Sequence, residues 1–240
     1  MKNKIKVFNF ITIVLIFILS ATSCSGQSGG GGKSLNSAEE LKKYLDSQPA
    51  NGPDKPIKVS MTINDPMLKS VADIIKSAGK YVSLNITGNA LTEIPYITFY
   101  ECKTLVGITI PNSVTEIGNS AFLNCTSLTS VTLGNSVKRI GDFAFINCSS
   151  LPSITIPNSV TTIKDQAFRL CTSLTSVTFE GTISSDNLVG MIDNFVGMNW
   201  LSPFDGDLRD KYLAGGIGTY TTTTPVPANI DDWKPVWTKK

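Results

Sequence analysis

The sequence predicts an α/β solenoid of about four stacked 23-residue coils with a cap at each end. Three observations lead to this fold class. Apolar residues recur with a fixed period of 23 in the middle of the chain, helix and strand patterns alternate before them, and the period ends ahead of an aromatic-rich tail. A fixed period of this length is typical of stacked coils, because one such unit is too small to bury its own apolar face and must cover its neighbour's.

Composition narrows the function classes. The chain has 240 residues, of which 41% are hydrophobic and 17% charged, enough apolar content to form a core. Its formal net charge is +2; without Lys2, Lys4 and Lys6, which lie in a predicted leader, the balance is 18 basic against 19 acidic residues, or −1. This balance disfavours a nucleic-acid partner. The sequence has no His, the commonest general base and zinc ligand, so we expect no enzyme activity, no cofactor and no bound metal.

Residues 1–23 are predicted to be a lipoprotein signal peptide. A basic start is followed by a largely apolar run of 13 residues, Val7 to Leu19, and then by small and polar residues. The run is shorter than the ~20 residues that span a bilayer as a helix. Ala21-Thr22-Ser23-Cys24 resembles a bacterial lipobox, although a large aliphatic residue is more usual than Ala21. An ordinary cleaved signal peptide is the alternative.

The lipobox resemblance implies that Cys24 is acylated and holds the exported protein on a membrane. Two or more acyl chains anchor a protein stably. Ser25 follows Cys24 where an Asp would imply retention at an inner membrane, so the expected location is the outer membrane or the cell surface. Residues 24–36 are then predicted to be a flexible Gly/Ser tether.

Residues 37–90 are predicted to form an N-terminal cap of helix, strand, helix and strand. Ser37 and Glu40 have capping-box spacing ahead of a helix from about Ala38 to Ser47. Alternating apolar residues predict strands over 57–63 and 82–86, and Asp65-Pro66 opens a second helix that ends near Gly79.

The repeats occupy residues 91–182. Within one unit we expect a short strand, a turn and a short helix, because Ile117, Ala121, Phe122 and Cys125 recur at helical spacing. The aligned inward positions are Phe99, Phe122, Phe145 and Phe168; Cys102, Cys125, Cys148 and Cys171; Leu105, Leu128, Leu151 and Leu174; and Ile108, Val131, Ile154 and Val177.

The unit from Ile110 to Leu133 resembles the BspA-like bacterial leucine-rich repeat, whose pattern is I-P-x-S-V-x-x-I-G-x-x-A-F-x-x-C-x-x-L-x-x-I-x-I. Val131 and Leu133 are conservative departures from it. The resemblance implies a leucine-rich-repeat solenoid that binds proteins or adheres to host or neighbouring cells. It covers the repeats and says little about the rest of the chain.

The four repeat cysteines allow three interpretations: a metal ladder, disulfides or buried thiols. Each lies on its own coil, so none forms a local pair with zinc-ligand spacing. Parallel side chains on adjacent coils hold the Cβ atoms too far apart for ordinary disulfide geometry. Buried, reduced thiols are favoured, because free Cys behaves as a small hydrophobe.

Residues 183–240 are predicted to be the C-terminal cap and tail, because the period fails at Asp186 and bulky aromatic residues follow. We expect these to cover the last coil, with a sugar-stacking platform as the less favoured alternative. Acidic residues in the tail lack calcium-loop spacing. The aromatic residues are Phe195, Trp200, Phe204, Tyr212, Trp233 and Trp237.

The candidate binding site is the outward face of the repeat strands. Small, mostly hydroxyl-bearing residues form two uncharged ladders there, which also suits simple strand propensity. Repeat proteins often bind partners on such an open surface. The predicted function is therefore a surface-exposed, lipid-anchored protein that mediates protein binding or adhesion. The first alternative is a structural or assembly component of the cell envelope, and a more distant one is a carbohydrate-directed enzyme. The ladder residues are Gly107, Thr109, Ser130, Thr132, Ser153, Thr155, Ser176 and Thr178.

Overall fold

The computed structural model describes residues 32–184, 187, 208–223 and 236–240. All of them belong to one compact unit, Gly31–Lys240. The predicted signal peptide and Cys24 lie outside the described residues, as do Asp186, Phe195, Trp200, Phe204 and Trp233. In the described part of the chain, no helix has the length and apolar character needed to cross a membrane.

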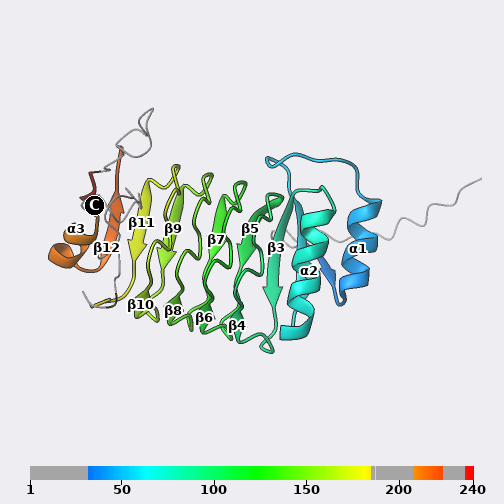
Figure 1. The fold of residues 1–240 in the computed structure, drawn as a ribbon, viewed down its shortest axis with the longest axis horizontal. Coiled ribbons are helices and arrows are strands. Elements are labelled where there is room, and N and C mark those ends of the chain that lie inside the picture. The colour runs from blue at the N-terminus through cyan, green and yellow to red at the C-terminus, as the bar shows by residue number, and fades with distance from the viewer. Residues whose placement is uncertain (1–31, 185–186, 188–207, 224–235) are drawn as a thin grey trace, which may run out of the picture. The chain divides into compact units, whose positions relative to one another are not determined.

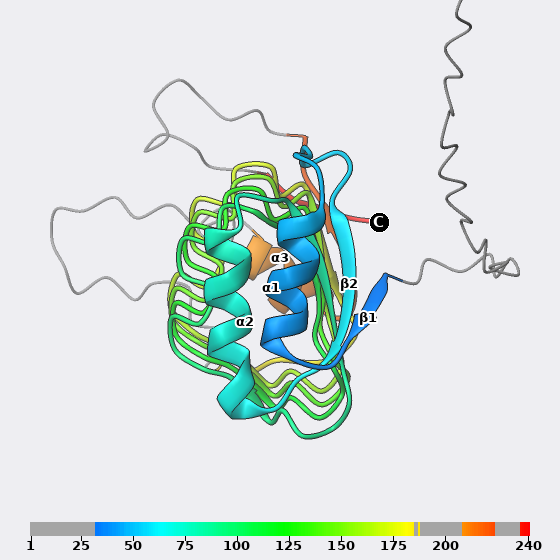
Figure 2. The same ribbon diagram turned by 90° about the vertical axis from the view of Figure 1, so that its right-hand side faces the viewer.

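The N-terminal cap contains two helices and three strands: β1 (Lys33–Leu35), α1 (Ala38–Ser47), β2 (Ile57–Thr62), α2 (Asp65–Ser77) and β3 (Val82–Thr87). At the start of α1, Ser37 Oγ accepts a hydrogen bond from the Glu40 amide at 3.1 Å, as the capping-box spacing predicts. Asn64 caps α2 in the same way, accepting from the Met67 amide. The two helices lie side by side over the N-terminal end of the stacked coils (Figure 2).

The structure corrects one end of the predicted tether. Lys33–Leu35 were assigned to a flexible segment, but they form β1, which pairs in parallel with β2. Leu35 is buried in the core. Burial of the Leu35 side chain and the backbone hydrogen bonds to β2 stabilise this strand, although the residues just before it are Gly and Ser.

Each of four coils contributes one strand to each of two parallel rows (Figure 1). The first row continues the sheet that contains β3. We call this row, together with the cap strands that flank it, the major sheet. The second row, the minor sheet, consists of two-residue strands in the order β10-β8-β6-β4. The major-sheet strands are β5 (Leu105–Thr109), β7 (Ser130–Thr132), β9 (Ser153–Ile156) and β11 (Ser176–Phe179), and the minor-sheet strands are β4 (Glu93–Ile94), β6 (Glu116–Ile117), β8 (Arg139–Ile140) and β10 (Thr162–Ile163).

Pairing in the major sheet is interrupted between β7 and β9, although the two strands are neighbours (Figure 1). Thr129 and Thr175 each donate a backbone hydrogen bond to the preceding coil, to Val106 and Pro152 respectively. The equivalent residue of the third coil is Pro152, which has no N–H to donate. Pro152 therefore removes one backbone hydrogen bond between the second and third coils at the break in the ladder.

The predicted helix in each coil is wrong. Two residues per coil have positive φ, for example Ser120 at 54° and Asn124 at 62°. The Phe122 and Asn124 amides donate to carbonyls of the next coil, at 2.8 and 2.9 Å, rather than along a helix. The helical spacing of Ile117, Ala121, Phe122 and Cys125 reflects consecutive turns that bury these four side chains. These turns carry the chain between the two sheets.

The core is a stack of equivalent side chains. Phe99, Phe122, Phe145 and Phe168 are fully buried, with ring centroids 5.0–5.2 Å apart and planes within 4° of parallel. Identical residues at equivalent positions bring the rings together, because successive coils repeat the same backbone path.

The C-terminal end is covered by α3 (Leu208–Gly215), β12 (Gly218–Thr221) and β13 (Thr238–Lys239). β12 and β13 extend the major sheet beyond β11 in antiparallel pairing. Tyr212 and Trp237 are buried, as expected for cap residues. The Tyr212 hydroxyl accepts from the Ile183 amide and donates to the Gly181 carbonyl, which fixes the end of the last coil against α3.

Candidate binding surfaces

The outward side of the major sheet, which we call the strand face, carries two columns of small polar residues. Register places Gly107 beside Ser130, and Thr109 beside Thr132. It also places Ser153 beside Ser176, and Thr155 beside Thr178. Neither column contains a charged residue in the four coils, as the sequence predicts.

Exposure varies along these columns. Ser130, Thr132, Ser153 and Thr155 are exposed, whereas Thr109, Ser176 and Thr178 are only half-buried. Gly107 is buried, so its expected exposure is wrong. The register between β3 and β5 shifts at Ser83, and a Cβ atom at Gly107 would lie 2.7 Å from Ser83 Oγ. The open part of the strand face is therefore centred on the second and third coils.

The columns continue into both caps, beyond the residues predicted from the sequence. Asn85 and Ser60 extend the threonine column on the N-terminal side. Thr219 extends it on the C-terminal side, where its hydroxyl and that of Thr178 are hydrogen-bonded at 2.9 Å. Strand alternation puts these residues on an outward side, but only the register shows that they join one column.

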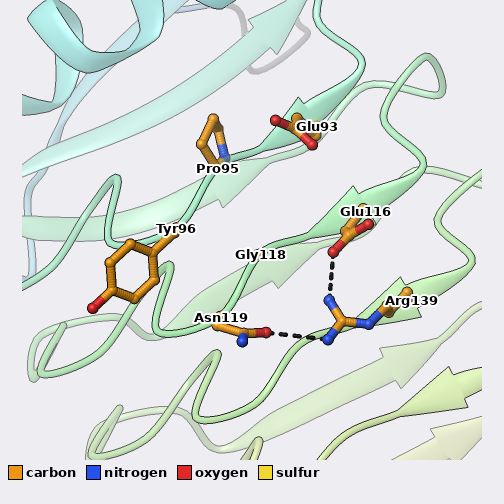
Figure 3. Close-up of a pocket in the computed structure, with 7 residues that line it drawn as sticks. All are labelled: Glu93, Pro95, Tyr96, Glu116, Gly118, Asn119 and Arg139. Carbon is orange, nitrogen blue, oxygen red and sulfur yellow. Dashed lines mark hydrogen bonds and ion pairs between the residues drawn. The ribbon is translucent and has the colours of Figure 1, made fainter.

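A second surface feature is a pocket of about 260 Å³ over the minor sheet, lined by Glu93, Pro95, Tyr96, Glu116, Gly118, Asn119 and Arg139 (Figure 3). Arg139 donates to Glu116, the adjacent residue on the neighbouring strand, and to Asn119 Oδ1 at 3.2 Å. Glu93 stands beside Glu116 on its other side. In the described chain no cation pairs with Glu93.

Gly118, one of the residues that line this pocket, packs closely against the backbone of the preceding coil. A Cβ atom there would lie 2.8 Å from both the Ile94 carbonyl oxygen and the Tyr96 amide nitrogen. Only a residue without a side chain fits between these two coils. This pocket was not predicted from the sequence. The sequence does contain one signal for it: Glu93, Glu116 and Arg139 are spaced 23 residues apart and differ in charge, which indicates a column that is not part of the uniform core.

The four repeat cysteines are free and buried, as predicted. Three of them donate from Sγ to the Phe carbonyl of the preceding coil; Cys148 does so to Phe122 at 3.3 Å. Burial raises the pKa of Cys102 from 9.0 to about 11 and that of Cys171 to about 12. Burial likewise raises the pKa of Cys125 and Cys148 well above 9.0. These buried thiols are therefore protonated at neutral pH.

Potential metal ligands are dispersed in the described chain. Within residues 32–184 and the described parts of the tail, no group of three or more Cys, Asp or Glu side chains could hold a metal ion. Among the stacked cysteines, Cys125, Cys148 and Cys171 donate hydrogen bonds to backbone carbonyls.

Together, the two rows of parallel strands and the continuous apolar stack define a leucine-rich-repeat solenoid. Residues 80–187 match the model of the BspA type leucine rich repeat region, with 6 copies. The repeat region of this chain is therefore a BspA-type leucine-rich repeat region. No curated protein matches the chain.

Several solved leucine-rich repeat proteins are similar to part of this chain. One from Bacteroides capillosus is 38% identical, with a TM-score of 0.36, over 38% of this chain and 65% of its own. One from T. pallidum is 32% identical, with a TM-score of 0.39, over 40% of this chain and 46% of its own. A third, from Bacteroides ovatus, is 25% identical, with a TM-score of 0.39, over 61% of this chain and 31% of its own. The chain thus spans less than two thirds of the length of each.

Proposed function

We propose that this protein is a surface-exposed, lipid-anchored and non-catalytic binding module that holds a partner protein against its strand face. The observation that carries the proposal is the exposed centre of that face, where Ser130, Thr132, Ser153 and Thr155 form an uncharged surface. Small side chains allow a partner to approach closely, and their hydroxyls can donate and accept hydrogen bonds. Leucine-rich repeats generally bind proteins, which supports the same function.

The proposed anchor is Cys24, which follows small residues and precedes a Gly/Ser-rich stretch. Acylation there would place the solenoid at the outer membrane or cell surface. A Cys24→Ala variant should lose lipid labelling and move from the detergent phase to the aqueous phase on phase separation. A variant that still partitions into detergent and carries lipid would contradict the proposed anchor.

The binding site is tested by replacing Thr132, Thr155 and Thr178 with Lys. These side chains point away from the core, so the triple variant should change the free energy of unfolding by only about 1 kcal/mol. Its added charges should abolish capture of partner proteins from neighbouring cells, measured by affinity purification and mass spectrometry.

A matched control places the same three charges elsewhere in the repeats. Thr92, Thr115 and Thr161 are exposed residues at equivalent positions beside the minor sheet. Their replacement with Lys should leave capture by the strand face intact. If the control loses the partner and the strand-face variant keeps it, the proposed binding site is wrong.

A further inference from the structure

The pocket over the minor sheet has a chemistry different from that of the strand face. Its column runs Glu93, Glu116, Arg139 and Thr162 in successive coils, so each coil presents a different side chain at one equivalent position. The neighbouring turn column runs Tyr96, Asn119, Asp142 and Asp165. Since the core residues repeat while these change, the fold does not dictate their identity.

Charge within the pocket is incompletely balanced. Arg139 contacts Glu116 and lies 3.6 Å from Asp142. Glu93 is exposed, lies next to Glu116 in direct register, and has no cationic partner in the described chain. Two like charges in direct register repel each other, and Arg139 neutralises only one of them. A cation bound beside Glu93 would relieve this repulsion.

An exposed aromatic ring borders the same pocket. Tyr96 is 65% exposed, although a large aromatic side chain is normally buried. Figure 3 shows its ring at one side of the pocket, with Glu93, Glu116 and Arg139 along the strands at the other. Ile97, the next residue, is 43% exposed and has a φ of 53°, which is unusual for a β-branched residue. The first coil thus presents apolar surface directly beside unbalanced negative charge.

We propose that this pocket binds the cationic side chain of a Lys or Arg residue in a partner polypeptide. The ammonium or guanidinium group is placed at Glu93, and the apolar stem of the side chain lies against the Tyr96 ring. The Asn119 side-chain oxygen is already engaged by Arg139 and by the Asp142 amide, which leaves its NH₂ group to donate to a backbone carbonyl of the partner. This site lies on a surface other than the strand face. The inference depends on the proposed function in one respect only, namely that the partner is a protein.

The test is a titration of the full-length, isotope-labelled chain in detergent with N-acetyl-trilysine amide. Binding is monitored at low salt through the backbone amide chemical shifts in NMR spectra. Shift changes should cluster at Glu93, Gly118 and Asn119, and binding should weaken as salt is added. The same peptide with acetylated ε-amines should bind at least about three-fold more weakly, because the cation is lost.

Variants localise the interaction. Glu93→Gln and Tyr96→Ala should each raise the Kd of the trilysine peptide at least about three-fold. Glu39→Gln, which removes an exposed carboxylate on α1, should leave the Kd unchanged, and melting temperatures verify that all variants are folded. An unchanged Kd in Glu93→Gln, equal binding of the acetylated peptide, or shifts confined to the strand face would overturn the proposal.

Two further outcomes separate this site from other possibilities. Binding of maltohexaose, but not trilysine, at the same amides would make the pocket a sugar site and reject the cation site. The titration uses no cellular partner, so its result is independent of the strand-face experiment. A positive titration with failed capture contradicts the proposed function alone, and the reverse contradicts the pocket alone.

Discussion

The strand face and the minor-sheet surface are built from the same four coils, yet they differ in how their side chains vary. On the strand face, Thr109, Thr132, Thr155 and Thr178 are identical from coil to coil. On the minor sheet, equivalent positions change from Glu to Arg to Thr. A uniform surface suits broad contact with a partner, whereas a varied one can recognise a particular side chain. The comparison shows that one repeated backbone can support both kinds of surface.

Both surfaces depend on the shared core, so the largest expected effect comes from breaking the phenylalanine stack. Phe145→Ala removes a fully buried ring that stacks on both Phe122 and Phe168. The free energy of unfolding should fall by about 3–5 kcal/mol, measured by urea denaturation. Phe143→Ala is the matched control. Phe143 is half-buried, so its truncation should cost less than about half as much. Equal losses would show that the stack is not the stabilising feature.

A smaller effect is expected from the thiols at alkaline pH. In the folded chain burial raises the pKa of Cys102 to about 11 and that of Cys171 to about 12, whereas the thiols of the unfolded chain have a pKa near 9.0. The unfolded state therefore releases protons first as the pH rises, and the protein loses stability above about pH 9. For Cys102 the loss should be about 1–3 kcal/mol by pH 11.

The Cys102→Ala variant isolates this contribution from other alkaline titrations. It should be less stable than the parent at pH 7, because it creates a small cavity, but its stability should fall less steeply between pH 9 and 11. If the stability of the two proteins falls equally between pH 9 and 11, burial does not raise the pKa of the Cys102 thiol.

Much of the fold could be predicted from the sequence because its signals are local or strictly periodic. Ser37 and Glu40 predict the start of α1, and the Phe and Cys positions predict the inward stack. The helices expected within the coils were wrong, because inward residues of consecutive turns also recur at helical spacing. Strands of two residues, such as Glu116–Ile117, are too short to show alternation, so the minor sheet could not be predicted.

The candidate sites were less predictable, because they depend on register between coils. The hydroxyl columns follow directly from the period, but the burial of Gly107, which pairs with Ser83 next to a register shift, does not. The pocket requires Glu93 and Tyr96 of the first coil to meet Glu116 of the second and Arg139 of the third. The 23-residue spacing of the three charged residues indicates one column of changing charge, but the pocket itself forms only when the coils are stacked.

The most direct test of the strand-face assignment is photo-crosslinking on intact cells. A photoreactive benzoylphenylalanine is placed at Thr155 on the strand face or at Thr161 beside the minor sheet; both positions are exposed in the third and fourth coils. The account predicts a covalent adduct with a partner protein from position 155 and at most a weak one from position 161. Equal or stronger adducts from position 161, or none from position 155, would contradict it.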